Sequence, residues 1–205
     1  MSMRFKRILS FGMTPCPHDI FMFHALGQGV INQSPYGLSC TVADVEALGS
    51  MCLSGELDVA RVSARALPSV LDEYVLLRAG ANVVQGYGPL VVAADKREPQ
   101  ELRNMSLAIP GKMSTANFLL DMHGGHKGRR VEMEYASIMD AVLSGDVDAG
   151  LLTHEGRFGY ADKGLHMLLD LGGWWQEHTG LPLCLGAVVA RRALGMEGLK
   201  RIEQG

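Results

Sequence analysis

The chain alternates short apolar runs with helical segments along most of its 205 residues. The segment that Asp44 opens has apolar residues at Val45, Leu48, Met51 and Cys52, which would line one face of a helix. Strands that alternate with helices favour an α/β fold built on mixed, mostly parallel sheets. The runs that we expect to form strands are residues 7–11, 37–42, 58–62, 74–77, 106–109, 131–135 and 149–152.

Two extended apolar segments, residues 86–94 and 181–189, flank the second group of strands. We expect both to cross between lobes, which predicts a first lobe at 1–90, a second lobe at 91–185, and a return crossover at 186–205. The chain is expected to end there, before further helices that would cover the first lobe. Two lobes joined by two crossovers are typical of folds in which a ligand lies in a central cleft and the lobes close by a hinge.

Composition excludes several classes of function. The net charge is −3 and no stripe of Lys and Arg is present, so we expect no nucleic-acid partner. We expect no membrane partner, because no apolar stretch reaches the ~18 residues of a membrane span. The N-terminus lacks the apolar core of a signal peptide, and the four cysteines show no CxxC spacing. These features predict a cytoplasmic protein with reduced thiols.

A single histidine follows the apolar strand at residues 149–152. The segment Leu151–Tyr160 places His154, Glu155 and Arg157 directly after that strand. Open α/β sheets bind ligands beyond the carboxyl ends of their strands, and histidine changes its charge near neutral pH. This position favours His154 as a proton-transfer group, with capping of the next helix as the alternative.

Small polar residues occur at two more junctions between a strand and a helix, at residues 61–63 and 111–116. The N–H groups that a helix N-terminus exposes can hold a carboxylate, and the hydroxyls of Ser63, Ser114 and Thr115 would add donors. Plain N-capping is the alternative at each junction. Three such junctions together favour an anionic ligand.

Motifs for other chemistries are missing from the sequence. It contains no G-x-S-x-G and no G-x-G-x-x-G, and His123 and His126 lack a third metal ligand nearby, so we expect neither metal nor cofactor. Asp19, Asp44 and Glu46 remain alternative acid–base groups, with helix capping as their competing role. Trp174 and Trp175 fit either packing or stacking on a planar ligand.

Several motifs, in order from about residue 8 to 190, resemble the 1,4-dihydroxy-6-naphthoate synthase family of the futalosine route to menaquinone. They are Thr14–Asp19 (TPCPHD), Ala43–Glu46 (ADVE), Asp58–Ser63 (DVARVS), Gly88–Val92 (GPLVV), Ile109–Gly111 followed by Ser114–Ala116, His154–Tyr160 (HEGRFGY), Asp170–Trp175 (DLGGWW) and Thr179–Pro182 (TGLP).

The resemblance implies a type II periplasmic-binding-protein-like fold that works as a cytoplasmic lyase on cyclic dehypoxanthinyl futalosine, a small carboxylate-bearing substrate, without a cofactor. It implies that His154 is the catalytic base. The implied substrate-binding residues are Asp19, Arg61, Val62, Ser63, Ser114, Thr115 and Ala116.

Two other functions remain open, and the sequence leaves the oligomeric state undecided. A solute-binding protein of the same fold would carry a signal peptide and would not need His154. Chorismate dehydratase shares the fold, but the Pro-Cys-Pro-x-Asp motif at residues 15–19 and the His-Glu-x-Arg-Phe motif at residues 154–158 argue against it.

Overall fold

The computed structural model describes residues 7–31 and 35–204, which form two compact units. Unit 1 comprises Met1–Asn82 and Gly186–Gly205, and unit 2 comprises Val83–Leu185. Residues 1–6, on which part of the signal-peptide interpretation rests, lie outside the described residues. Among the residues that are described, no helix has both the length and the apolar character to cross a bilayer.

Unit 1 is built on a mixed sheet with strand order β2-β1-β3-β11-β4. β1 runs parallel to β2 and β3, whereas β11 runs antiparallel to β3 and β4. The strands are β1 (Arg7–Met13), β2 (Tyr36–Val42), β3 (Val59–Ser63), β4 (Tyr74–Leu76) and β11 (Leu183–Arg191), and β5 (Asn82–Val84) spans the boundary between the units in sequence. The helices are α1 (Pro17–Gly27), α2 (Val45–Leu53), α3 (Leu67–Val70), the 3₁₀ turn Arg192–Leu194 and α8 (Gly195–Glu203).

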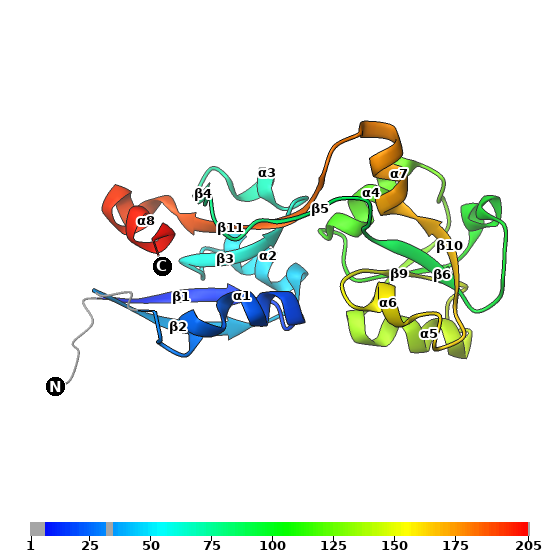
Figure 1. Ribbon diagram of the computed structural model, residues 1–205, viewed down its shortest axis with the longest axis horizontal. Helices are drawn as coiled ribbons and strands as arrows, with labels where there is room; N and C mark the ends of the chain where they lie inside the picture. Colours follow the sequence, from blue (N-terminus) through cyan, green and yellow to red (C-terminus); the bar gives the residue numbers. More distant parts are fainter. Residues whose placement is uncertain (1–6, 32–34, 205) are drawn as a thin grey trace. The chain divides into compact units, whose positions relative to one another are not determined.

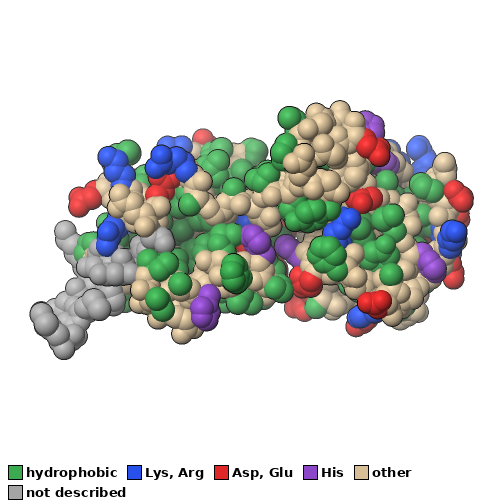
Figure 2. Space-filling model, in the orientation of Figure 1, with side chains coloured by type: hydrophobic (Ala, Val, Ile, Leu, Met, Phe, Trp, Pro, Cys, Tyr) green, Lys and Arg blue, Asp and Glu red, His purple; other side chains and the backbone are tan. Residues whose placement is uncertain are grey.

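Helices cover both faces of the unit 1 sheet. On one face, Phe11 and Val59 pack with Phe23 of α1 and Ile202 of α8. On the other face α2 packs against β3. Gly12 lies under α2, where an added Cβ would come within 2.7 Å of Leu48. The Lys, Arg, Asp and Glu side chains visible on unit 1 in Figure 2 gather around α8 and include both signs of charge.

Unit 2 has a second mixed sheet, with strand order β10-β6-β9-β7-β8. β7 runs parallel to β8 and β9, whereas β6 runs antiparallel to β9 and β10. The strands are β6 (Leu90–Ala93), β7 (Leu107–Ile109), β8 (Arg130–Glu132), β9 (Ala149–Leu152) and β10 (His166–Asp170). The helices are α4 (Thr115–His123), α5 (Ile138–Ser144), α6 (Gly156–Gly159) and α7 (Leu171–Thr179), with 3₁₀ turns at Pro99–Asn104 and Tyr135–Ser137.

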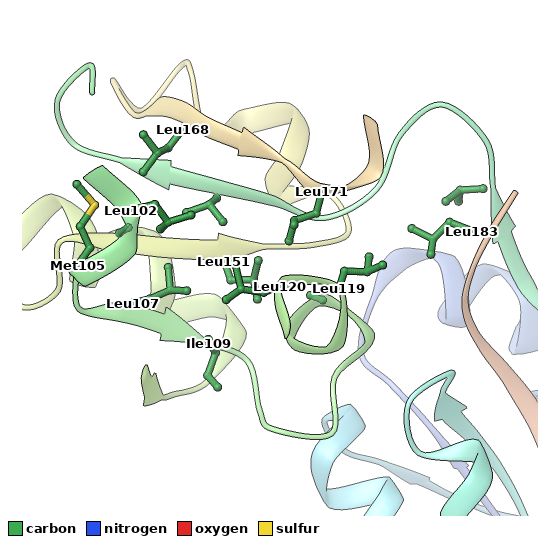
Figure 3. Close-up of a cluster of buried hydrophobic side chains, with 14 residues drawn as sticks. Leu102, Met105, Leu107, Ile109, Leu119, Leu120, Leu151, Leu168, Leu171 and Leu183 are labelled. Atoms are coloured by element: carbon green, nitrogen blue, oxygen red, sulfur yellow. The ribbon is translucent and has the colours of Figure 1, made fainter. Parts of the chain in front are cut away.

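Successive side chains of a strand point to opposite faces of the unit 2 sheet, and the buried residues therefore form two clusters. Leu107 and Ile109 of β7 point to the face covered by α4 and α7, whereas Ala108 between them points to the face covered by α5. Figure 3 shows Leu119 and Leu120 of α4 beside the strands of the first face. This two-residue period places helices on both sides of the sheet (Figure 1).

The structure confirms the α/β fold with mixed sheets. Residues 181–189 pass from unit 2 to unit 1, as predicted, and both extended segments contain a strand. Residues 90–93 form β6 and residues 183–191 form β11, and both strands lie inside a sheet, antiparallel to both neighbours. The sheets are therefore less parallel than predicted. Residues 83–90 group with unit 2 rather than with unit 1, because β6 pairs with β9 and β10.

Two local predictions were wrong. The strand expected at residues 131–135 ends at Glu132, and Tyr135 begins a 3₁₀ turn. The strand β10 (His166–Asp170) was missed, because its apolar run is only the three residues Met167–Leu169, between the polar His166 and Asp170.

A close backbone contact joins the segment before β6 to the start of α7. Gly88 lies so near to Gly172 that a Cβ on Gly88 would come within 2.8 Å of the Gly172 Cα. A Cβ on Gly172 would overlap the Gly88 nitrogen. Glycine at both positions therefore allows α7 to begin directly against the β6 segment.

We predict that Gly172→Ala destabilises unit 2 by about 1–3 kcal/mol, because the new methyl meets backbone that cannot rotate away. Urea denaturation followed by circular dichroism measures the loss. Gly159→Ala is the control, since nothing lies within 4 Å of a Cβ there, and it should change stability by less than about 0.5 kcal/mol. Equal stability of the two variants would contradict the close contact.

Candidate active site

His154 stands two residues beyond the end of β9, in the loop that leads into α6. It is the non-glycine residue with positive φ among the described residues, at 47°. A side chain in this left-handed region costs about 1–3 kcal/mol, and such residues cluster at functional sites. His154 is exposed, and the N-cap of α6 is Glu155. The positive φ, the exposure and the absence of a capping position at α6 favour a functional role for His154 over a role as a helix cap.

Tyr135 contacts the His154 loop on both sides of the histidine. Its hydroxyl donates a hydrogen bond to the Thr153 carbonyl and accepts one from the Gly156 N–H at 2.9 Å. Its ring meets the His154 ring edge to face, with centroids 5.6 Å apart. Burial raises the pKa of Tyr135 to about 12, so the hydroxyl stays protonated at ordinary pH. Local sequence does not mark Tyr135 as a site residue, because it ends the run 131–135 that resembles a strand.

Arg157 anchors the far end of the same loop. Its guanidinium donates to the Gly88 carbonyl and forms an ion pair with Asp170 at 3.2 Å. Asp170 in turn accepts hydrogen bonds from the N–H groups of Gly172 and Gly173, which caps α7. The loop is therefore fixed to the tight contact between Gly88 and Gly172, and Arg157 acts as a structural anchor beside the histidine.

The start of α4 follows the pattern of a capped helix. Ser114 is the N-cap, and its hydroxyl accepts from the Asn117 N–H at 3.2 Å and donates to the Gly111 carbonyl at 2.8 Å. The Thr115 hydroxyl donates to the Leu185 carbonyl at 2.6 Å. Ala116 is buried in the unit 2 core. Both hydroxyl protons thus have protein acceptors.

In unit 1, Arg61 and Asp19 form a buried ion pair. The Arg61 Nε lies 3.2 Å from an Asp19 oxygen, and both residues are nearly inaccessible to solvent. Thr14 donates to Asp19 through its hydroxyl at 2.7 Å and its N–H at 3.2 Å. Burial acts to raise the pKa of Asp19, but Arg61 and Thr14 outweigh it, and the pKa lies below its ordinary value. Asp19 is therefore an anion that holds Arg61.

The end of β3 is equally well fixed. Ser63 accepts a hydrogen bond from the Ala66 N–H at 3.0 Å, and Val62 is buried and offers its carbonyl to Arg61 at 3.4 Å. The guanidinium of Arg61 occupies space beside Gly186, where a Cβ would come within 2.6 Å of it. Residues 61–63 thus form one rigid group, in which Arg61 is engaged within the protein.

The other residues that the sequence singled out have structural contacts. Asp44 caps α2 by accepting from the Ala47 N–H at 2.8 Å. His126 is buried against the Met105 carbonyl at 2.9 Å. Trp174 packs against the His123 ring, and Trp175 donates to the Leu181 carbonyl at 3.0 Å. These contacts fit the capping and packing interpretations. Within residues 7–31 and 35–204, no group of three or more His, Cys, Asp or Glu side chains could hold a metal ion.

Comparisons with known proteins connect this geometry to a family. Residues 9–205 match a family model described as menaquinone biosynthesis. A 1,4-dihydroxy-6-naphtoate synthase of Thermus thermophilus is 46% identical over 194 residues, covering 94% of this chain and 69% of the relative. The enzyme of the same name from Streptomyces coelicolor is 43% identical over 199 residues, covering 95% and 70%.

A more distant solved structure shows the fold. The alkanesulfonate-binding protein SsuA from Xanthomonas axonopodis is 14% identical, with a TM-score of 0.74 over 96% of this chain and 70% of that chain. The chain therefore has the α/β fold of periplasmic solute-binding proteins, as the sequence predicted.

The buried ion pair of unit 1 leads to a testable prediction. We expect Asp19→Asn to cost about 3 kcal/mol at pH 7, because it leaves Arg61 buried without its counter-charge. Since the folded-state pKa of Asp19 is lowered, this stabilisation is present above the ordinary carboxyl pKa of about 4 and is lost as the pH falls through the lowered pKa. Denaturation curves at several pH values measure both effects.

Asp44→Asn is the matched control, because asparagine caps a helix about as well as aspartate does. It should leave stability nearly unchanged at every pH. The ion-pair interpretation is wrong if Asp19→Asn behaves like this control at pH 7.

Proposed function

Because this chain belongs to the menaquinone biosynthesis family, we propose that it is the lyase that converts cyclic dehypoxanthinyl futalosine to 1,4-dihydroxy-6-naphthoate. Two relatives that carry the name of this synthase, at 46% and 43% identity, support the assignment. The structural observation that carries it is His154, an exposed imidazole held in a left-handed conformation between two anchored segments.

His154 acts as the general base of an elimination. The imidazole takes the proton from an activated C–H of the substrate, and the electron pair of that bond forms a new double bond. The bond to the sugar-derived part breaks, and that part leaves with the bonding pair and receives the proton from the imidazolium. The remaining ring becomes an aromatic naphthoate, which favours the products. A well-placed base contributes a factor of about 10² to 10⁴ to such a step.

The substrate-binding residues that we propose lie at the start of α4 and at the end of β3. In unit 2, the first N–H groups of α4, at Thr115 and Ala116, bind substrate oxygens, with Ser114 fixing the start of the helix. In unit 1, Ser63 and the backbone of Val62 contribute contacts, and Arg61 paired with Asp19 holds this strand end in place. The ligand is a small molecule with a carboxylate, the group that a helix N-terminus binds well.

The cysteines support a reducing compartment. Cys16, Cys40 and Cys52 form no disulfide. Unpaired cysteines are usual in the cytoplasm, and we place the reaction there.

The direct experiment is incubation of the purified protein with cyclic dehypoxanthinyl futalosine, followed by mass-spectrometric detection of 1,4-dihydroxy-6-naphthoate. A parallel incubation with chorismate tests the related dehydratase. Naphthoate formation supports the assignment, whereas dehydration of chorismate overturns it. Binding of the futalosine without turnover would favour a solute-binding protein of the same fold.

We predict that His154→Ala lowers turnover by at least about 10²-fold while the protein remains folded, because the proton loses its acceptor. Product formation in a timed assay and a thermal denaturation curve measure the two quantities. His166→Ala, at an exposed histidine on β10, is the control and should keep near-normal turnover. Near-normal turnover in His154→Ala would exclude this histidine as the base.

The substrate-binding prediction can be tested with the product itself. Added 1,4-dihydroxy-6-naphthoate should shift the amide resonances of Ser63, Thr115 and Ala116 in ¹⁵N-labelled protein, because a carboxylate changes the shielding of N–H groups that it binds. The amides of His123 and His126 serve as internal controls. Shifts centred on these two histidines would place the ligand elsewhere and contradict the proposal.

A further inference from the structure

The hydroxyl of Tyr135 closes a short bridge around His154. It donates to the carbonyl of the residue before the histidine, Thr153, and it accepts from the N–H of the second residue after it, Gly156. Tyr135 itself lies in the 3₁₀ turn between β8 and α5, so it comes from a different segment of unit 2. A single phenol therefore fixes both ends of the four-residue segment Thr153–Gly156, whose second residue carries the imidazole.

The position of Gly156 fits this bridge. A Cβ at Gly156 would overlap the Tyr135 hydroxyl and would come within 2.9 Å of the Met139 side chain. The backbone of residue 156 can approach the phenol only because it has no side chain. Since the φ of Gly156 is not in the left-handed region, the glycine is explained by the close approach and not by its own conformation.

The hydrogen bonds of Tyr135 constrain His154, whose backbone conformation is unfavourable for the isolated residue. His154 has a φ of 47°, which histidine without tertiary constraint seldom adopts. The hydrogen bonds on either side of it restrict the backbone, and the edge-to-face contact with the Tyr135 ring restricts the imidazole. Orientation of a base matters, because a small misplacement of reacting groups costs a large factor in rate.

We propose that Tyr135 is a positioning residue for His154, which holds the imidazole in its reactive orientation through the Thr153 and Gly156 backbone and through ring contact. The inference rests on the proposed function only in that His154 is taken to be the base. Tyr135 touches His154 and its loop, and no direct role in the chemistry is assigned to it.

The protonation state of the phenol is consistent with this role. Because burial raises the pKa of Tyr135 to about 12, the O–H donor to Thr153 is present throughout the pH range in which an imidazole titrates. Removal of the hydroxyl should therefore reduce the rate by the same factor from about pH 6 to pH 9.

The central test is Tyr135→Phe, which keeps the ring and removes both hydrogen bonds. We expect kcat to fall by about tenfold with KM changed by less than about twofold, because orientation of the base and not substrate binding is lost. Tyr160→Phe removes a phenol from the same unit and is the matched control, with kcat near that of the wild type. An unchanged kcat in Tyr135→Phe, or a rise in KM alone, overturns the proposal.

A double-mutant cycle separates positioning from general structural support. In the His154→Ala background, Tyr135→Phe should cause no further loss of turnover, because no base remains to be positioned. An additional tenfold loss in the double variant would show that Tyr135 acts independently of His154, which overturns the proposal.

A measurement without substrate distinguishes this proposal from the proposed function. Amide hydrogen exchange at His154, Glu155 and Gly156 should be at least about tenfold faster in Tyr135→Phe than in the wild type, and unchanged in Tyr160→Phe. If the wild type forms no naphthoate, the proposed function fails while this comparison still decides whether Tyr135 holds the loop. Equal exchange in Tyr135→Phe and wild type overturns the positioning role.

Discussion

A strand that is apolar on both faces must be covered by helices on both sides, and this constraint organises each unit. In unit 2, Leu107 and Ile109 face α4 and α7 while Ala108 faces α5. In unit 1, Phe11 faces α1 and α8 while Gly12 makes room for α2. Once the helices are packed in this way, the loops that join strands to helices are confined to the ends of the sheet. The candidate functional residues lie at these ends: Ser63 is the last residue of β3, and Ser114 and His154 lie in the loops that lead into α4 and α6.

A series of contacts connects the core of unit 2 to His154, the candidate base. α7 begins against the β6 segment because Gly88 and Gly172 lack side chains. Asp170 caps that helix and pairs with Arg157, which fixes one end of the His154 loop, and Tyr135 fixes the loop around the histidine. An exposed imidazole with positive φ is therefore held by the partly buried side chains of Tyr135, Arg157 and Asp170. A surface loop can present a catalytic group reliably only when such contacts outweigh its local strain.

Features decided by a few consecutive residues were predictable. Asp44 caps α2 and Ser114 caps α4, because an N-cap bonds to an N–H three residues away. The strand before His154 could be recognised from its apolar run. The role of Tyr135 was not predictable, since its partners lie 18 and 21 residues further along the chain. Arg61 could be named as a candidate, but its burial against Asp19 comes from a contact across 42 residues.

The sequence by itself determined the fold class, the family resemblance and the identity of the candidate base, because periodicity, capping and ordered motifs are properties of neighbouring residues. Tertiary structure decided that residues 90–93 and 183–191 are antiparallel strands inside the sheets, since strand direction depends on partners far away in sequence. Tertiary structure also decided which polar residues form hydrogen bonds or ion pairs with other parts of the protein. Hydrogen bonds and ion pairs form between groups that folding brings within about 3 Å, and local sequence does not encode that distance.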